Sequence, residues 1–249
     1  MSLTFRDMGL AIVRAIPSLE RVARRLYTWL PHAFHDTPAK RLRAFFAGES
    51  DVAFIQIGAY DGVAGDPVRP ILLDSPGWRG VLVEPQPGAY ARLIQNYAHQ
   101  TDRLVFLNAA ISTSRGERLL FRIEDADVER LALPDWAGEI ASLDESHLTR
   151  HFPHANITQI CVKTLLFADV ASNFADGRVD AVIMDVEGHE RPILENIEFD
   201  RHRVRFILFE HKHMNVAEKS LVADLLGRRG FALKEYGRDT VAWRKSAAA

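Results

Sequence analysis

Residues 52–62 read Val-Ala-Phe-Ile-Gln-Ile-Gly-Ala-Tyr-Asp-Gly, a short apolar run that ends in a turn with two glycines. Such a run is typical of a strand buried on both faces of a parallel sheet. Four more apolar runs follow along the chain, and each ends at a polar residue. They are residues 81–83 before Glu84, 104–107 before Asn108, 179–184 before Asp185 and 204–209 before Glu210. Helical spacing at residues 87–97 and 221–226 alternates with the strands, which predicts an α/β fold with helices on both faces of the sheet.

The chain divides into an N-terminal extension and one larger domain. Residues 1–50 carry eight basic and four acidic side chains, with apolar residues at mostly helical spacing, so we expect a basic helical extension. It either caps the main domain or contacts an oligomer partner or a membrane surface. The main domain is expected to span residues 51–245 and to end in an antiparallel hairpin of residues 231–233 and 240–243. Residues 117–167 are its least regular segment, either a cover for a substrate or a variable surface excursion.

The composition excludes several classes of protein. The chain has 249 residues, of which 47% are hydrophobic and 26% charged, which is typical of a globular domain rather than a disordered or fibrous chain. Its formal net charge of −2 argues against general binding to a nucleic-acid backbone. One cysteine, Cys161, cannot form an internal disulfide. Since no apolar run approaches the roughly 18 residues that span a bilayer, and no secretory signal is recognisable, we expect a cytoplasmic protein.

The ends of the five strands predict a ligand site. In an open parallel sheet, ligands bind outside the carboxyl ends of the strands. Gly58 and Gly62 would let the backbone approach a ligand closely. The turn lacks both the Gly-x-Gly-x-x-Gly pattern and a Gly-Lys-Ser/Thr loop, so a nucleoside without phosphates fits better than a dinucleotide or a nucleoside triphosphate. Glu84, at the end of the next strand, could accept hydrogen bonds from both ribose hydroxyls.

Four segments together resemble the FkbM family of S-adenosylmethionine-dependent methyltransferases. They are residues 54–62, 80–85, 108–112 and 185–190, the last reading Asp-Val-Glu-Gly-His-Glu. The resemblance covers about residues 50–245. It implies a class I methyltransferase fold, Rossmann-like, with a seven-stranded mostly parallel sheet and an antiparallel last strand. It also implies S-adenosyl-L-methionine as the cofactor and, most often in this family, O-methylation of sugars or natural products.

The resemblance further implies a set of cofactor-binding residues. Glu84 would hold the ribose, Asn108 and Ala109 would border the adenine, and Asp185 would face the amino-acid end of the cofactor or the reaction centre. Gln56 departs from the family pattern, which often has an acid there, and an amide only partly replaces a carboxylate facing an ammonium group. The complete expected set is Gln56, Gly58, Tyr60, Asp61, Gly62, Glu84, Asn108, Ala109, Ser142 and Asp185.

The candidate catalytic residues are Asp185, His189 and His211. A hydroxyl is a poor nucleophile at neutral pH, so a histidine that removes its proton would help, and His213 is a further candidate. Asp185, Glu187, Glu210 and the two histidines after it also offer donor atoms for a divalent cation. Because glutamates and histidines at strand ends are often only solvated loop residues, we expect no metal in the site.

The resulting hypothesis is an O-methyltransferase that acts on a hydroxyl of a sugar, a glycan or a small natural product. Two alternatives remain open. The first is a non-catalytic binding module that keeps the fold but catalyses no reaction. Gln56 supports this alternative, because an amide only partly replaces the acid that is common at this position. A nicotinamide-dependent oxidoreductase is disfavoured because the glycines that accommodate a pyrophosphate are missing.

Overall fold

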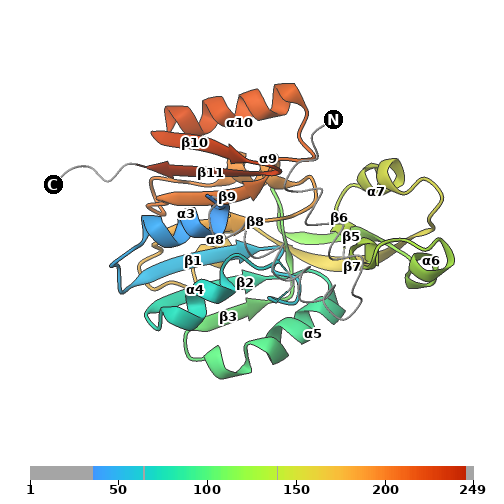
Figure 1. The fold of residues 1–249 in the computed structure, drawn as a ribbon, viewed down its shortest axis with the longest axis horizontal. Helices are drawn as coiled ribbons and strands as arrows, with labels where there is room; N and C mark the ends of the chain where they lie inside the picture. The colour runs from blue at the N-terminus through green and yellow to red at the C-terminus, as the bar shows by residue number, and fades with distance from the viewer. Residues whose placement is uncertain (1–35, 64, 139, 245–249) are drawn as a thin grey trace, which may run out of the picture.

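The computed structural model describes residues 36–63, 65–138 and 140–244, and its main body is a seven-stranded sheet with the strand order β10-β11-β9-β8-β1-β2-β3 (Figure 1). All neighbouring strands pair in parallel except β11, which is antiparallel to both β9 and β10. The predicted mostly parallel sheet with an antiparallel last strand is therefore confirmed. The strands are β1 (Val52–Ile57), β2 (Trp78–Val83), β3 (Leu104–Leu107), β8 (Ala181–Met184), β9 (Phe206–Glu210), β10 (Phe231–Tyr236) and β11 (Asp239–Arg244).

Helices cover both faces of the sheet. Successive residues of β1 point to opposite faces, so Phe54 joins one hydrophobic cluster while Ala53 and Ile55 join the other. The Phe54 cluster includes residues of α3 (Pro38–Phe45), α4 (Arg69–Asp74) and α5 (Pro87–Asn96). The opposite cluster includes residues of α8 (Phe167–Ala171), α9 (Glu190–Asn196) and α10 (Val216–Arg228). This two-sided burial explains why the strands are apolar throughout.

Local signals in the sequence set where the covering helices begin. Thr37 caps α3 by accepting a hydrogen bond from the Lys40 amide, and Pro38 occupies the first turn of that helix, where a missing N–H costs little. At the start of α10, the side chains of Asn215 and Glu218 bond reciprocally to each other's backbone amides and form a capping box.

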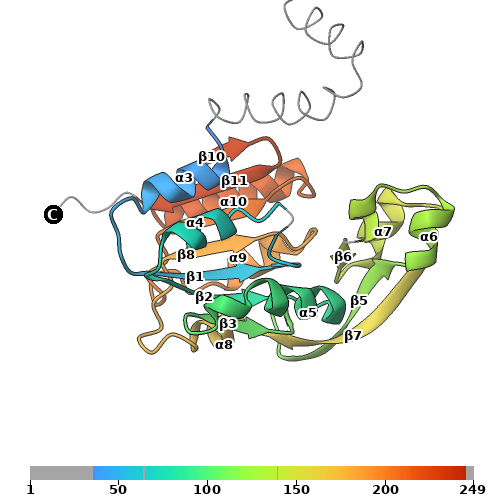
Figure 2. The ribbon, with the colours of Figure 1, turned by 60° about the horizontal axis from the view of Figure 1, so that its bottom comes forward.

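Residues 117–167 form an ordered second sheet, so the expectation that this segment is the least regular was wrong. Its strand order is β4-β7-β5-β6, and β5 and β7 pair along an eight-residue antiparallel ribbon. Figure 2 shows this unit projecting from one side of the main sheet. The sequence concealed the strands because most side chains of β5 and β7 are partly or fully exposed, and only Ala110, Leu120 and Val162 form a small core. The elements are β4 (Ala110–Ile111), β5 (Gly116–Ile123), α6 (Asp125–Arg130), η2 (Asp135–Gly138), β6 (Ala141–Ser142), α7 (Glu145–His151) and β7 (Ile157–Leu165), and η1 (Ala98–Gln100) precedes β3.

Only the last part of the predicted N-terminal extension is described. The helices expected before residue 36, and their contact with an oligomer partner or a membrane surface, lie outside the described residues. From residue 36 onward the chain packs on the main domain: Leu42 of α3 is buried, and the Arg41 guanidinium lies 4.3 Å from the centre of the Trp243 ring. Within the described ranges, no helix is both long enough and apolar enough to cross a membrane.

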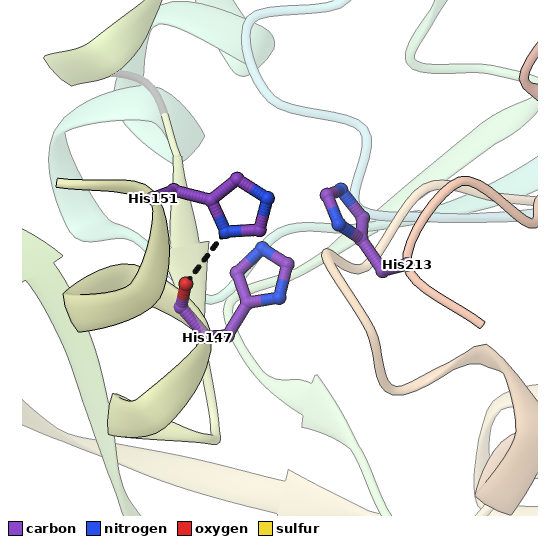
Figure 3. A group of neighbouring side chains, drawn as sticks. All are labelled: His147, His151 and His213. Atoms are coloured by element: carbon purple, nitrogen blue, oxygen red, sulfur yellow. Dashed lines mark hydrogen bonds between the residues drawn. The ribbon is translucent and has the colours of Figure 1, made fainter. Parts of the chain in front are cut away.

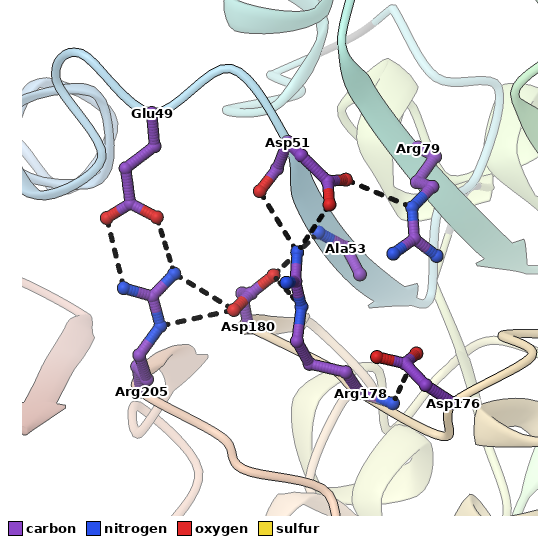
Figure 4. A network of polar contacts seen from close by, with 8 residues as sticks. All are labelled: Glu49, Asp51, Ala53, Arg79, Asp176, Arg178, Asp180 and Arg205. Atoms are coloured by element: carbon purple, nitrogen blue, oxygen red, sulfur yellow. Dashed lines mark hydrogen bonds and ion pairs between the residues drawn. The ribbon is translucent and has the colours of Figure 1, made fainter.

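A network of charged residues ties together the amino ends of β1, β8 and β9 (Figure 4). Asp180, whose side chain is only 3% exposed, accepts a hydrogen bond from the Ala53 amide at 2.9 Å. The same carboxylate pairs with Arg205 at 2.9 Å and with Arg178 at 3.1 Å. These arginines also bond to Glu49 and Asp51. The network gives the buried Asp180 carboxylate and the Ala53 amide their partners at the end of the sheet opposite the predicted site.

We expect Asp180→Ala to lower the free energy of unfolding by roughly 1–3 kcal/mol, because it leaves the buried Ala53 amide without its acceptor and removes one acidic partner from each of the two arginines. Urea denaturation followed by circular dichroism measures this change. Asp176→Ala is the matched control, since Asp176 is exposed and only accepts a bond from the Arg178 amide. Equal stability losses in the two variants would contradict the role assigned to Asp180.

Candidate functional site

A cavity of about 830 Å³ opens at the carboxyl ends of the central strands. That volume lies within the roughly 300–1,000 Å³ of typical small-molecule sites. In Figure 1 the arrowhead of β1 points toward the second sheet, and this sheet contributes Ile111, Leu120, Ala141 and Leu143 to the cavity wall. Among the predicted site residues, the cavity is lined by Gln56, Gly58, Tyr60, Glu84, Ala109, Asp185 and His189.

The turn after β1 brings the backbone of two strands together. Gly58 has φ +75°, and a Cβ placed on it would lie 1.8 Å from the carbonyl oxygen of Asp185. Glycine is therefore required at this position both by conformation and by space. Tyr60 also has a positive φ, of +48°, which is unusual for a residue with a side chain. Its amide donates a hydrogen bond of 2.9 Å to Glu84 Oε2, so the carboxylate holds the turn in this conformation.

Glu84 is a buried carboxylate at the end of β2. It is 3% exposed and also accepts a 2.8 Å bond from the Gln86 amide. Burial raises the pKa of Glu84 to about 7, although the bonds from Gln86 and Tyr60 and the charge of Arg92 favour the ionised form. Each oxygen retains a further lone pair, so the ionised group could accept hydroxyl hydrogen bonds from a ligand in the cavity.

Gln56 is the last but one residue of β1, and it is buried in the cavity wall. Its Nε2 donates to Asp66 Oδ1 at 3.3 Å, whereas its Oε1 has no hydrogen-bond partner among the described residues. Asp66 also lines the cavity, and it accepts bonds from the Val68 and Arg69 amides and from the Tyr97 hydroxyl. Burial raises the pKa of Asp66 above its ordinary value in spite of these donors. An unpartnered amide oxygen beside a carboxylate is suited to a ligand that carries an ammonium group.

The Asp-Val-Glu-Gly-His-Glu segment forms a loop that holds itself in place. The Glu190 carboxylate accepts bonds from the Val186 and Gly188 amides at 3.0 and 3.1 Å. Glu187 adopts a φ of +50°, and its carbonyl accepts a 2.9 Å bond from the Ser142 hydroxyl of β6. The second sheet is thereby linked directly to the loop after β8. A positive φ at a non-glycine residue is a local strain that these contacts maintain.

Carboxylates gather around Asp185 in this part of the cavity. Solvent can reach the Asp185 side chain where it lines the cavity. Protein atoms nevertheless surround this side chain closely. Desolvation first, and then the charges of Glu210 and Glu187, raise the pKa of Asp185 well above its ordinary value. Burial likewise raises the pKa of Glu190 to about 7. A protonated Asp185 would act as a hydrogen-bond donor rather than as an anion.

The pKa values of His189 and His213 are shifted in opposite directions. Burial, and then the charge of Arg118, lower the pKa of His189, and its Nε2 has no hydrogen-bond partner in the described part of the chain. Burial alone would also lower the pKa of His213, but its ion pairs with Glu187 and Glu210, at 3.0 and 3.2 Å, outweigh burial and raise it to about 9. Burial by itself would raise the pKa of Glu187. The contacts with His147 and His213 outweigh burial and lower this pKa to about 2.

Several predicted residues lie beside the cavity rather than in its lining. The Asn108 amide donates to the carbonyls of Glu84 and Pro85, at 2.8 and 3.1 Å, and so stabilises the turn that carries Glu84. The Ser142 hydroxyl is used by the Glu187 carbonyl. The Asp61 carboxylate accepts a bond from the Val63 amide, and a Cβ added to Gly62 would lie only 2.3 Å from the Tyr97 ring and 2.7 Å from Leu93. His211 is buried, with its Nδ1 2.7 Å from the Thr240 hydroxyl, and lines a separate cavity of about 230 Å³.

Sequence reasoning passed over Asp66 and His147 as site residues. Asp66 lies in the loop after the glycine turn, where a single acidic residue gives no periodic signal. His147 is in α7 of the second sheet's unit, and only the folded chain brings it within 3.5 Å of Glu187. From the sequence, Glu187 and Glu210 were expected only as possible metal donors, and His213 both as a possible metal donor and as a further candidate base. The sequence did contain one indication of His147. Its four-residue spacing from His151 places both rings on the same side of a helix.

The model of the methyltransferase FkbM domain matches residues 56–237 of the sequence. The chain belongs to the FkbM methyltransferase family. This match confirms the family resemblance of the four segments. No curated protein matches the sequence.

Solved structures of methyltransferases are similar to this FkbM-family chain. The FkbM methyltransferase of Methylobacillus flagellatus KT has a TM-score of 0.50 and 15% identity, covering 95% of this chain and 60% of that one. A precorrin-6y C5,15-methyltransferase from Geobacter metallireducens GS-15 has a TM-score of 0.43 and 10% identity, covering 83% and 87% of the two chains. Aeropyrum pernix fibrillarin, solved with natively bound S-adenosyl-L-methionine, has a TM-score of 0.41 and 13% identity, covering 88% and 74%. The sheet order and the family match together confirm the class I methyltransferase fold.

We expect Gly58→Ala to destabilise the protein and to prevent ligand binding in the cavity, because the added methyl group would collide with the Asp185 carbonyl. Thermal denaturation and calorimetric titration with S-adenosylhomocysteine measure the two effects. Gly177→Ala is the control: its φ of +63° is also positive, but a Cβ there would meet no atom within 4 Å, and Gly177 does not line the cavity. If both variants bound the nucleoside as the wild type does, the close approach at Gly58 would not matter for the site.

Proposed function

We propose that this FkbM-family chain is an S-adenosylmethionine-dependent O-methyltransferase that acts on a hydroxyl of a sugar, a glycan or a small natural product. The observation that carries the proposal is the cavity at the strand ends, in which a glycine turn, a buried carboxylate at Glu84 and an unpartnered amide oxygen at Gln56 lie together. Each of these groups fits a different part of a nucleoside that bears an amino-acid chain. The family match supports methyl transfer as the class of reaction.

The cavity residues suggest how the cofactor would be held. Glu84 would accept hydrogen bonds from the ribose hydroxyls, and Ala109 and Ile111 offer an apolar surface for the adenine. Gln56 Oε1 would accept from the ammonium group, with the nearby Asp66 carboxylate adding a favourable charge. Asp66 would then compensate for the amide at Gln56, which the sequence analysis identified as a departure from the family pattern. Asn108 would act indirectly, by holding the Glu84 turn.

The bound cofactor supplies a methyl group on a sulfonium, which is a good leaving group. The protein's task is to align the acceptor oxygen with that methyl group and to remove the hydroxyl proton. We assign the proton transfer to His189, because its lowered pKa favours the neutral imidazole, the residue lines the cavity, and its Nε2 has no hydrogen-bond partner among the described residues. His189 would accept the hydroxyl proton as the acceptor oxygen is methylated, so no free alkoxide would have to form. A protonated Asp185 can donate a hydrogen bond at the cavity floor.

The charges at this end of the cavity favour a hydroxyl-rich acceptor over a nucleic acid. Glu187, Glu210 and Asp239 line the wall, and their carboxylates can accept hydrogen bonds from sugar hydroxyls. Lys212 and Arg238 also line this wall, but the three carboxylates outnumber them and would repel a phosphodiester backbone. The second sheet, with Leu120 and Leu143 in the wall, would serve as the cover over the acceptor.

We expect Glu84→Gln to weaken binding of S-adenosylmethionine at least about tenfold, because hydrogen bonds to a charged acceptor contribute roughly 1.5–3 kcal/mol. In the wild type the dissociation constant should rise about tenfold between about pH 8 and about pH 6, since protonation of a group with a pKa of about 7 removes the charged acceptor. Calorimetry at several pH values measures both effects, and the Glu84→Gln variant should lose this pH dependence.

The control for Glu84 is Glu129→Gln, an exposed residue of α6 that lies outside the cavity. Titration with NAD in the same experiment tests the oxidoreductase alternative. Binding of NAD without binding of S-adenosylmethionine would overturn the proposed function, and tight cofactor binding without transfer to any hydroxyl acceptor would favour the non-catalytic module.

We expect His189→Ala to lower turnover by about 10²–10⁴-fold while leaving the cofactor dissociation constant within a factor of about two, as for the loss of a general base. The assay follows formation of S-adenosylhomocysteine with pooled glycan and small-molecule hydroxyl acceptors. His154→Ala is the control, because His154 is exposed. His211→Ala tests the second candidate base: a loss of turnover there, with His189→Ala fully active and both proteins folded, would transfer the assignment to His211.

A further inference from the structure

Three donor atoms from the ends of β8 and β9 converge beside the cavity. Glu187 Oε2, Glu210 Oε2 and His213 Nε2 all lie within 4.8 Å of one another. The His213 nitrogen is 3.0 Å from the first oxygen and 3.2 Å from the second. Glu210 is the last residue of β9, and the other two residues lie in the loops that follow β8 and β9. The parallel arrangement of these strands therefore places the three side chains at one point.

The three atoms are close together but are not joined by well-directed hydrogen bonds. Each is buried, and in the part of the chain that the structure describes none has a hydrogen-bond partner of acceptable geometry. The Glu210 and His213 side chains are only 5% and 6% exposed. The ion pairs at 3.0 and 3.2 Å hold the three atoms together without well-directed hydrogen bonds, and a cation at the point they share would give each atom a directed partner.

The two separations from His213 Nε2, 3.0 and 3.2 Å, match those of a metal-binding site, and the two carboxylate oxygens lie within 4.8 Å of each other. Bonds of about 2.0–2.1 Å from a tetrahedral zinc ion would place neighbouring donor atoms about 3.3 Å apart. The donor set of two carboxylates and one imidazole suits Zn²⁺, Mn²⁺ or Co²⁺ better than Mg²⁺ or Ca²⁺, which prefer oxygen ligands alone. Three protein ligands with one open position are typical of catalytic rather than structural zinc sites.

Further imidazoles from α7 stand next to these donors, as Figure 3 shows for the rings of His147, His151 and His213. The His147 and His213 ring centres are 4.1 Å apart, and His147 Nε2 is 3.5 Å from Glu187 Oε2. His151 Nδ1 lies 2.8 Å from the His147 carbonyl oxygen. A carbonyl can only accept, so this nitrogen carries a proton, and a metal ion would bind through Nε2. Fixing a tautomer through a backbone carbonyl is how proteins commonly prepare a histidine ligand.

We propose that Glu187, Glu210 and His213 bind one divalent transition-metal cation, with the histidines of α7 beside it and one coordination position facing the cavity. Glu187 and Glu210 both line that cavity, so a hydroxyl acceptor bound there could reach the cation. A cation in this position lowers the pKa of a coordinated hydroxyl and stabilises the developing alkoxide. Binding of the cation does not depend on the proposed function, whereas this role in catalysis rests on it. The proposal departs from the expectation of a metal-free site.

The test uses the full chain, stripped with a chelator and then dialysed against Zn²⁺ or Co²⁺ without a methyl donor. We expect one equivalent of either metal per chain by elemental analysis, visible ligand-field absorption for Co²⁺, and much weaker uptake of Mg²⁺. His213→Ala and Glu187→Gln should each weaken Zn²⁺ binding at least about tenfold, as expected for the loss of a metal ligand. His154→Ala and His99→Ala, which change exposed histidines elsewhere on the molecule, should bind as the wild type does.

Three results would overturn the metal site. The first is no stoichiometric uptake, which would leave His213 as the cationic partner of two carboxylates. The second is uptake that His213→Ala and Glu187→Gln leave unchanged in folded protein. The third is uptake that His154→Ala reduces equally, which would indicate binding to surface histidines. Circular dichroism and thermal denaturation establish folding of each variant, and Glu187→Gln keeps the shape of the side chain. Because uptake is measured without methyl donor, the metal site and the proposed methyl transfer can fail independently.

Discussion

The close contact between the Gly58 turn and the Asp185 carbonyl is the constraint on which the rest of the site depends. A single methyl group at Gly58 would overlap the Asp185 oxygen. The turns after β1 and β8 can therefore approach each other this closely only with glycine at position 58. This contact places Asp185 in the cavity floor and lets the Tyr60 amide reach Glu84. The cavity is thus a direct consequence of two adjacent parallel strands ending at the same level.

The second sheet covers the carboxyl ends of the strands and partly encloses the cavity there. A bare parallel sheet would leave the ends of β8 and β9 open to solvent. The bond from the Ser142 hydroxyl to the Glu187 carbonyl links the second sheet to the strained loop after β8, and α7 brings His147 against Glu187. The strained φ of Glu187 is maintained by contacts that come from a different part of the chain. Loss of the second sheet would therefore alter the site as well as uncover it.

The buried carboxylates at the two ends of the main sheet differ in how fully they are paired. At the amino ends, Asp180 is matched by two arginines and a backbone amide, and these contacts satisfy its carboxylate. At the carboxyl ends, Asp185 lies among like charges, and Glu84 is buried with only backbone donors and a distant arginine. Leaving polar groups incompletely matched costs stability, and such groups are characteristic of sites where a ligand supplies the missing partners. The satisfied network at one end helps the fold to tolerate the unsatisfied groups at the other.

The sequence alone determined the order of the strands along the chain, the antiparallel hairpin, the family, and the polar residues at each strand end. These features are local, because an apolar run and the turn after it lie within a few consecutive residues. It did not reveal the second sheet, whose strands are largely exposed and lack a strong apolar pattern. Only the tertiary structure decided that His189 faces the main cavity while His211 faces another, and that Asn108 and Ser142 bond to backbone carbonyls. It alone placed Glu187, Glu210 and His213 at one point, because that arrangement depends on how loops distant in sequence pack against one another.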